Sequence, residues 1–117
     1  MEIALDVARL ADLIDDVGDL AFVQETVGVY LAELPGRRDA IVAAAENGDL
    51  GRLRNEAHSL GSASAMIGAA ELLTICRRIE GIQSADDTAD LSAMMADWPA
   101  VCARAEAALT RWLRTDG

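Results

Sequence analysis

Apolar residues recur at every third or fourth position in one segment of this chain after another. In the segment 49–68, Leu50, Leu53, Ala57 and Leu60 follow this spacing, which is typical of one buried face of an α-helix. The same pattern occurs in 5–16, 19–34, 37–46, 49–68, 69–82 and 89–113, with a polar loop expected over 81–88. The chain is therefore predicted to form consecutive amphipathic helices.

Residues that start and stop helices separate these segments. Asp49 is a suitable N-cap for the segment that follows it, and Gly68 is a suitable stop. Pro35 and Gly36 are expected to end one helix before the next begins. Pro99 is expected to interrupt the last helix, because it removes one backbone hydrogen bond and produces a kink or a restart.

Composition favours packed helices over a sheet. Hydrophobic residues make up 52% of the chain and aromatic residues only 3%, and alanine and leucine are abundant. A length of 117 residues suits one modest core and not two. We therefore expect a single all-α domain over 1–117, built as an antiparallel up-down four-helix bundle with one or two additional short N-terminal helices.

Charge and cysteine content restrict the partners and the compartment. The net charge of −10 disfavours nucleic acid and anionic membranes, and no apolar run is long enough for a membrane span. Cys76 and Cys102 show no metal-binding spacing, so they are expected to be buried free thiols and the site to hold no metal. No signal peptide is visible, and a cytoplasmic location is expected.

His58 is the only histidine of the chain. It falls about 140° from the centre of the apolar stripe of its helix, so its imidazole is expected to face solvent. An ordinary solvated surface histidine would fit this position equally. The residues expected around it on the same face are mostly small, which would let a large partner approach; they are Gly51, Arg54, Asn55, Gly61, Ser62 and Ala65.

The residues after this histidine carry a resemblance to a known family. The string Ala57-His58-Ser59-Leu60-Gly61-Ser62-Ala63-Ser64-Ala65-Met66-Ile67-Gly68-Ala69, followed by Leu72, Cys76, Ile79 and Glu80, resembles the signature of histidine-containing phosphotransfer (HPt) domains. The likeness extends along nearly the whole chain. It implies a helical module that carries a phosphoryl group on His58 between receiver domains of two-component relays.

The resemblance also implies roles for neighbouring residues. A glutamate or glutamine commonly lies 22 positions after the family's histidine and orients it, and that position is Glu80 here. Glu80 could also be an ordinary exposed carboxylate. The family's usual lysine and glycine are replaced by Gly61 and Ser62, and the chain contains no lysine, so Arg54 is the candidate for neutralising the phosphoryl group.

The expected partners are the receiver domains of a response regulator or a hybrid histidine kinase, bound by a monomer. The expected partner-binding residues are Asn55, Gly61, Ser62 and Ala65, and apolar candidates with an equally good core explanation are Ile14, Val17, Phe22 and Val23. Several arginines are expected near the histidine and form a candidate positive patch; they are Arg52, Arg54, Arg77 and Arg78. Alternatively, these arginines only solvate the surfaces of their helices.

The resemblance implies a phosphoryl carrier and not an enzyme. No Gly-rich phosphate loop or Walker lysine is present, so no cofactor of its own is expected, and Mg²⁺ is expected on the partner receiver. Three alternatives stay open. They are the phosphoacceptor domain of a chemotaxis-type histidine kinase, a degenerate receiver-binding module without transfer, and a structural bundle unrelated to signalling.

Overall fold

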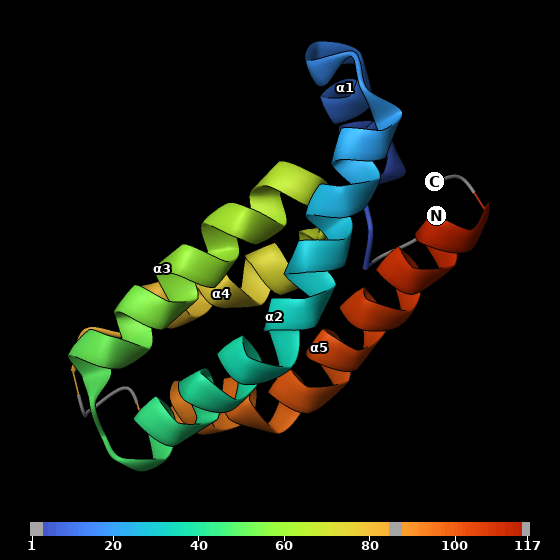
Figure 1. Cartoon of the computed structure of the whole chain (residues 1–117). Coiled ribbons are helices and arrows are strands. Elements are labelled where there is room, and N and C mark those ends of the chain that lie inside the picture. The colour runs from blue at the N-terminus through green and yellow to red at the C-terminus, as the bar shows by residue number, and fades with distance from the viewer. Residues whose placement is uncertain (1–3, 85–87, 116–117) are drawn as a thin grey trace.

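The computed structural model describes residues 4–84 and 88–115. These residues form five helices and no strand (Figure 1). The helices are α1 (Val7–Val17), α2 (Leu20–Glu46), α3 (Leu50–Ile67), α4 (Ala70–Glu80) and α5 (Thr88–Thr115). The loop expected over 81–88 lies partly outside the described residues.

The four helices α2 to α5 form the bundle. Each packs against its neighbours in the order α2, α3, α4, α5 and back to α2, and the most extensive contact is between α3 and α4. The short α1 lies across one end of this bundle, against α2 and α3 (Figure 1). The predicted all-α four-helix bundle with a short N-terminal helix is therefore confirmed.

The prediction that Pro35 and Gly36 separate two helices is wrong, because α2 continues through both. Pro35 and Gly36 are exposed, whereas Leu34 and Ile41 on either side are buried. A proline inside a helix costs about 3 kcal/mol. Burying one leucine or isoleucine contributes about 1.5–3 kcal/mol. Burial on both sides of the proline therefore offsets its cost.

The same reasoning applies to α5, which does not restart at Pro99. Pro99 is exposed, and the adjacent Trp98 is fully buried in the core. The indole Nε1 of Trp98 also donates a 3.2 Å hydrogen bond to the carbonyl of Arg38 in α2. This packing keeps both sides of the proline in one helix.

Specific capping residues start and end α3. The Asp49 side chain accepts a hydrogen bond from the backbone N–H of Arg52 at 3.1 Å, which is the expected N-cap. Gly68 ends the helix with φ of 81°, in the left-handed region. A Cβ atom at Gly68 would lie 2.6 Å from the carbonyl oxygen of Asp6, so only glycine allows the segment before α1 to approach α3.

A polar pair is buried between α2 and α3. The hydroxyl groups of Tyr30 and Ser64 share a 2.8 Å hydrogen bond, and burial raises the pKa of Tyr30 despite the opposing effect of that bond. The described part of the chain contains no buried side-chain nitrogen or oxygen without a hydrogen-bond partner. This pair joins α2 to α3 inside the core, and neither hydroxyl is buried without a hydrogen-bond partner.

The two cysteines are free and buried, as the sequence predicts. Burial raises the pKa of Cys76 to about 12, and burial likewise raises the pKa of Cys102 to about 12. Both thiols are therefore protonated at neutral pH and act as small apolar core groups. Within the described residues, none of the helices has the length and apolar character needed to cross a membrane.

Candidate functional site

His58 lies near the middle of α3 and points out of the bundle. Its side chain is 66% exposed, as the helical periodicity predicts. Asn55 and Ser62 are also exposed on this face, and Ala65 is half-buried. No bulky side chain among these neighbours encloses the imidazole, so a partner can reach it.

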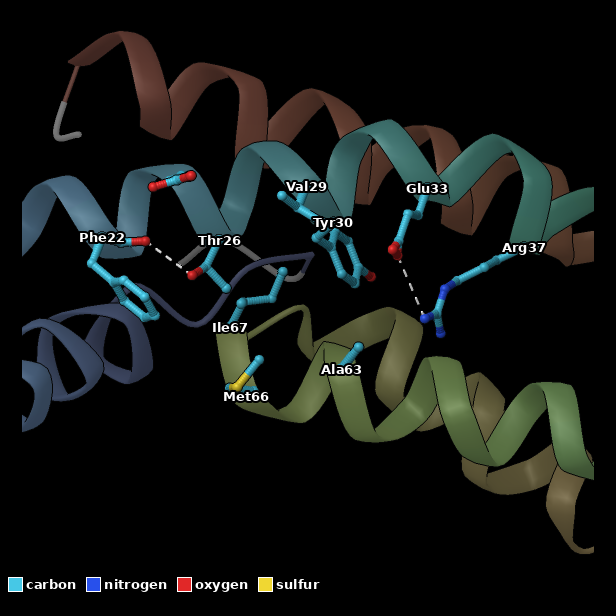
Figure 2. Close-up of a pocket in the computed structure, with 10 residues that line it drawn as sticks. Phe22, Thr26, Val29, Tyr30, Glu33, Arg37, Ala63, Met66 and Ile67 are labelled. Carbon is cyan, nitrogen blue, oxygen red and sulfur yellow. Dashed lines mark hydrogen bonds and ion pairs between the residues drawn. The ribbon is translucent and has the colours of Figure 1, made fainter.

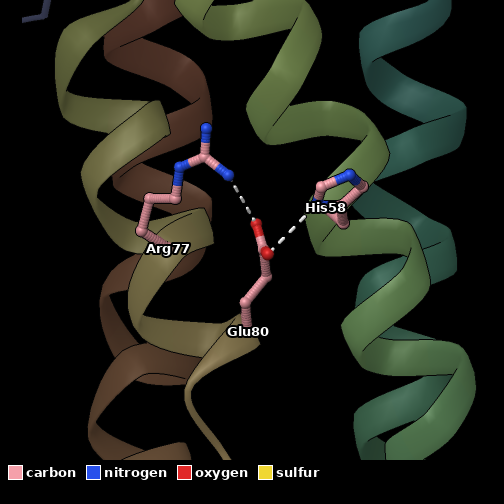
Figure 3. Close-up of polar contacts among 3 residues, drawn as sticks. All are labelled: His58, Arg77 and Glu80. Carbon is pink, nitrogen blue, oxygen red and sulfur yellow. Dashed lines mark hydrogen bonds and ion pairs between the residues drawn. The ribbon is translucent and has the colours of Figure 1, made fainter.

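Glu80 contacts the imidazole from the neighbouring helix. It is the last residue of α4, and its Oε2 lies 3.1 Å from Nδ1 of His58 (Figure 3). An ionised carboxylate only accepts hydrogen bonds, so Nδ1 carries the hydrogen and its N–H group donates the hydrogen bond to Oε2 of Glu80. The other ring nitrogen, Nε2, points away from Glu80 and carries the lone pair in the neutral form of the ring.

Gly61 does not lie on the exposed face where it was expected, because the structure buries it between α3 and α4. A Cβ atom there would lie 3.3 Å from Cβ of Cys76 and 3.6 Å from Oε1 of Glu80. Gly61 is three residues after His58, which places it about 60° round the helix on the flank that faces α4. Its missing side chain lets α4 bring Glu80 close to His58.

Arg77 completes the site, although the sequence analysis placed it only in a general positive patch. Its Nη1 donates a 3.1 Å hydrogen bond to Oε1 of Glu80, the carboxylate oxygen that His58 does not use. Figure 3 shows Glu80 between Arg77 and His58. The spacing of three residues between Arg77 and Glu80 is a recognisable helical ion pair, and this signal could have identified the contact.

Arg54 is directed toward the end of α4. Its Nη1 donates a 2.9 Å hydrogen bond to the carbonyl of Ile82, just after that helix. Arg54 and Glu80 both line a small polar hollow, so Arg54 lies near the site, and the hydrogen bond described for its guanidinium goes to Ile82 and not to His58. Arg52 is exposed in the first turn of α3, and Arg78 lines a different groove, between α4 and α5.

An apolar groove lies between α2 and α3, the helix that carries His58. Its α3 side includes Ala63 and Met66, and its α2 side runs from Phe22 past Val29 to Arg37 (Figure 2). The guanidinium of Arg37 donates a 3.3 Å hydrogen bond to Oγ of Ser59, the residue after His58. One residue of the groove thus contacts the residue that follows His58.

Apolar side chains at this groove are unusually exposed. Phe22 and Val29 are each 54% exposed, and Met66 is 42% exposed. Of the four apolar docking candidates, Phe22 and Val17 are exposed, whereas Val23 is buried and Ile14 half-buried in the core. Exposed apolar groups gathered beside a polar site are typical of protein interaction surfaces.

The arrangement suits nucleophilic chemistry at one nitrogen. A neutral imidazole whose Nδ1–H is held by a carboxylate presents the Nε2 lone pair as a nucleophile. Among the described residues, no group of three or more histidine, cysteine, aspartate or glutamate side chains is placed to hold a metal ion. The fold and the site thus define a helical bundle that displays one oriented imidazole.

Comparison with known proteins agrees with this class. A model of the Hpt domain family matches residues 25–113, and the chain belongs to this family of phosphotransfer modules of two-component systems. Such domains carry phosphoryl groups and interact with receiver domains.

One solved structure supports the fold assignment. The HPT domain from the Hpt sensor hybrid histidine kinase of Shewanella matches with a TM-score of 0.74 and 18% sequence identity, over 97% of each chain. At this identity the likeness concerns the fold. No curated protein matches the chain significantly.

Proposed function

We propose that this protein is a phosphorelay intermediate that accepts a phosphoryl group from a receiver-domain aspartate on His58 and passes it to another receiver. The observation that carries the proposal is the 3.1 Å contact between Nδ1 of His58 and Oε2 of Glu80, on a side chain that is 66% exposed. The contact orients the nucleophile, and the exposure makes it accessible.

In the proposed step, Nε2 of His58 attacks the phosphorus of the receiver's aspartyl phosphate. The bond between Nε2 and phosphorus forms as the bond between phosphorus and the aspartate oxygen breaks, and the aspartate leaves as a carboxylate with the electron pair. The proton stays on Nδ1, so the phosphorylated ring becomes cationic. The carboxylate of Glu80 lies against Nδ1 and balances that charge.

The remaining machinery is proposed to come from the partner. Phosphoryl transfer depends mainly on alignment and charge neutralisation, and Mg²⁺ bound by the receiver would supply much of the latter. Arg54 is a candidate for part of it, because its guanidinium has five N–H groups and the hydrogen bond to Ile82 uses one of them. We further propose that the protein acts as a monomer in the cytoplasm and needs no cofactor of its own.

The groove between α2 and α3 is proposed as the receiver-docking surface, together with Asn55, Ser62 and Ala65. Met66 is eight residues after His58, which places it about 80° round α3. The two positions also differ by about 12 Å along the helix axis, so a partner of domain size seated on the groove would reach the imidazole. The small residues between them leave room for it.

A transfer assay tests the proposed function. Incubation with a phosphorylated receiver domain is expected to place a label on this protein that is labile in acid and stable in base, as a phosphohistidine is. The same assay with unlabelled acceptor receiver should then remove the label. If a receiver binds this protein but no label appears, the protein is a receiver-binding module without transfer, and the proposal is wrong.

A second prediction concerns docking. Val29→Asp is expected to weaken receiver binding by at least about tenfold, because it places a charge in the apolar part of an interface. The matched control is Ala103→Asp, which adds the same charge on the exposed face of α5. Isothermal titration calorimetry with an unphosphorylated receiver would measure both, and equal affinities for the two variants would contradict this docking surface.

A further inference from the structure

We infer that Arg77 is a positioning residue, which holds the Glu80 carboxylate in the orientation that keeps the proton on Nδ1 of His58. The inference rests on the proposed function, because it assigns the control of the nucleophile to a residue that does not touch it. Three side chains lie in a row, with Arg77 and His58 on opposite sides of Glu80 (Figure 3).

The two oxygens of the carboxylate are divided between two donors. Oε1 accepts from Nη1 of Arg77 at 3.1 Å, and Oε2 lies 3.1 Å from Nδ1 of His58. With Oε1 occupied, the carboxylate cannot rotate freely about its last bond without losing a charge-assisted hydrogen bond. The contact with Arg77 therefore holds the carboxylate so that its remaining oxygen meets the imidazole.

The location of Glu80 explains why such a constraint is needed. Glu80 is the last residue of α4, where the backbone is held by fewer helical hydrogen bonds. A negative side chain is also disfavoured at the C-terminal end of a helix. Arg77 is one turn earlier on the same helix, and its positive charge offsets that penalty.

Gly61 of α3 bounds the Glu80 carboxylate on the side away from Arg77. A Cβ atom there would lie 3.6 Å from Oε1, the oxygen that Arg77 binds. The carboxylate is thus bounded by α3 on one side and by a guanidinium on the other. No lysine exists in this chain to do the same, and the hydrogen bond of Arg54 goes to the carbonyl of Ile82 and not to Glu80.

An ordinary surface ion pair is the competing explanation, since Arg77 is 51% exposed. The two explanations differ in what the pair does to His58. A helix-stabilising pair would leave the imidazole tautomer unchanged, whereas a positioning residue would alter it. Because the chain has one histidine, its two ring nitrogens give a single pair of ¹⁵N signals.

The experiment compares Arg77→Met with Arg78→Met. Arg78 is the adjacent residue of α4, and the substitution removes the same charge, but its side chain lines the groove toward α5. In ¹⁵N NMR spectra of the full chain, Arg77→Met is expected to increase the fraction of His58 protonated on Nε2, whereas Arg78→Met leaves the fraction unchanged. Arg77→Lys should restore part of the wild-type ratio. Identical spectra for Arg77→Met and Arg78→Met would overturn the inference.

A kinetic measurement separates this inference from the proposed function. Phosphoramidate, a small phosphoryl donor, is expected to label Arg77→Met about two- to fivefold more slowly than wild type, the size of effect typical of an exposed ion pair. In a Glu80→Gln background the same substitution should have no further effect. If Arg77→Met slows labelling of the Glu80→Gln protein by the same factor as it slows labelling of the wild type, Arg77 acts independently of Glu80. The NMR result stands even if no receiver transfers phosphate to the protein.

Discussion

Replacing His58 with glutamine is expected to reduce receiver-dependent phosphoryl labelling to background. Glutamine has a similar size and can keep a contact with Glu80, but its amide nitrogen is not a nucleophile. The chain has no second histidine that could substitute. Labelling by a phosphorylated receiver, followed by acid and base treatment, measures the effect.

The fold should tolerate this change. The side chain of His58 is 66% exposed and makes one described hydrogen bond, to Glu80. Surface substitutions of this kind usually alter the free energy of unfolding by less than about 0.5 kcal/mol. Urea unfolding of the variant serves as the control. An acid-labile label that persists in folded His58→Gln would show that another residue accepts the phosphoryl group.

Replacing Gly61 with leucine is expected to lower the free energy of unfolding by about 1–3 kcal/mol, the usual cost of overpacking a core. Even the Cβ atom would lie 3.3 Å from Cβ of Cys76 and 3.9 Å from Cδ1 of Leu73. The larger side chain would push α4 away from α3. Glu80 would then lose its contact with His58, and labelling by phosphoramidate should slow together with the loss of stability.

Ser62→Leu is the matched control for this stability effect. Ser62 is the next residue of α3 and is exposed, so a leucine at this position would face solvent. Leucine is a better helix former than either glycine or serine, and the gain over glycine is the larger. A loss of stability in Gly61→Leu alone therefore reports packing against α4. If urea unfolding gives both variants the stability of the wild type, the close contact between α3 and α4 is not needed.

The positions of the helices could be predicted because periodicity is a local property. Spacing of apolar residues located α1, α3, α4 and α5 to within a few residues of the observed ends. It failed at Pro35, where the local signal for a break was overruled by burial of Leu34 and Ile41 in the tertiary core. Proline penalties are local, but the burial that offsets them depends on neighbouring helices.

The candidate site was predictable in part for the same reason. The exposure of His58 follows from its angle to the apolar stripe of its own helix. Gly61 lies between the buried and exposed faces of α3, and only the approach of α4 decides that it is buried. The groove beside Val29 likewise exists only because α2 and α3 leave a gap in their packing.

The amino-acid sequence alone determined the all-α class, the single outward imidazole and the family resemblance, because each depends on residue identity and on spacing within one helix. The tertiary structure alone decided that one carboxylate meets both Arg77 and His58, with a different oxygen of Glu80 toward each. The contact with His58 crosses from α4 to α3, and the rotation of each helix about its axis is fixed by the packing of all four bundle helices.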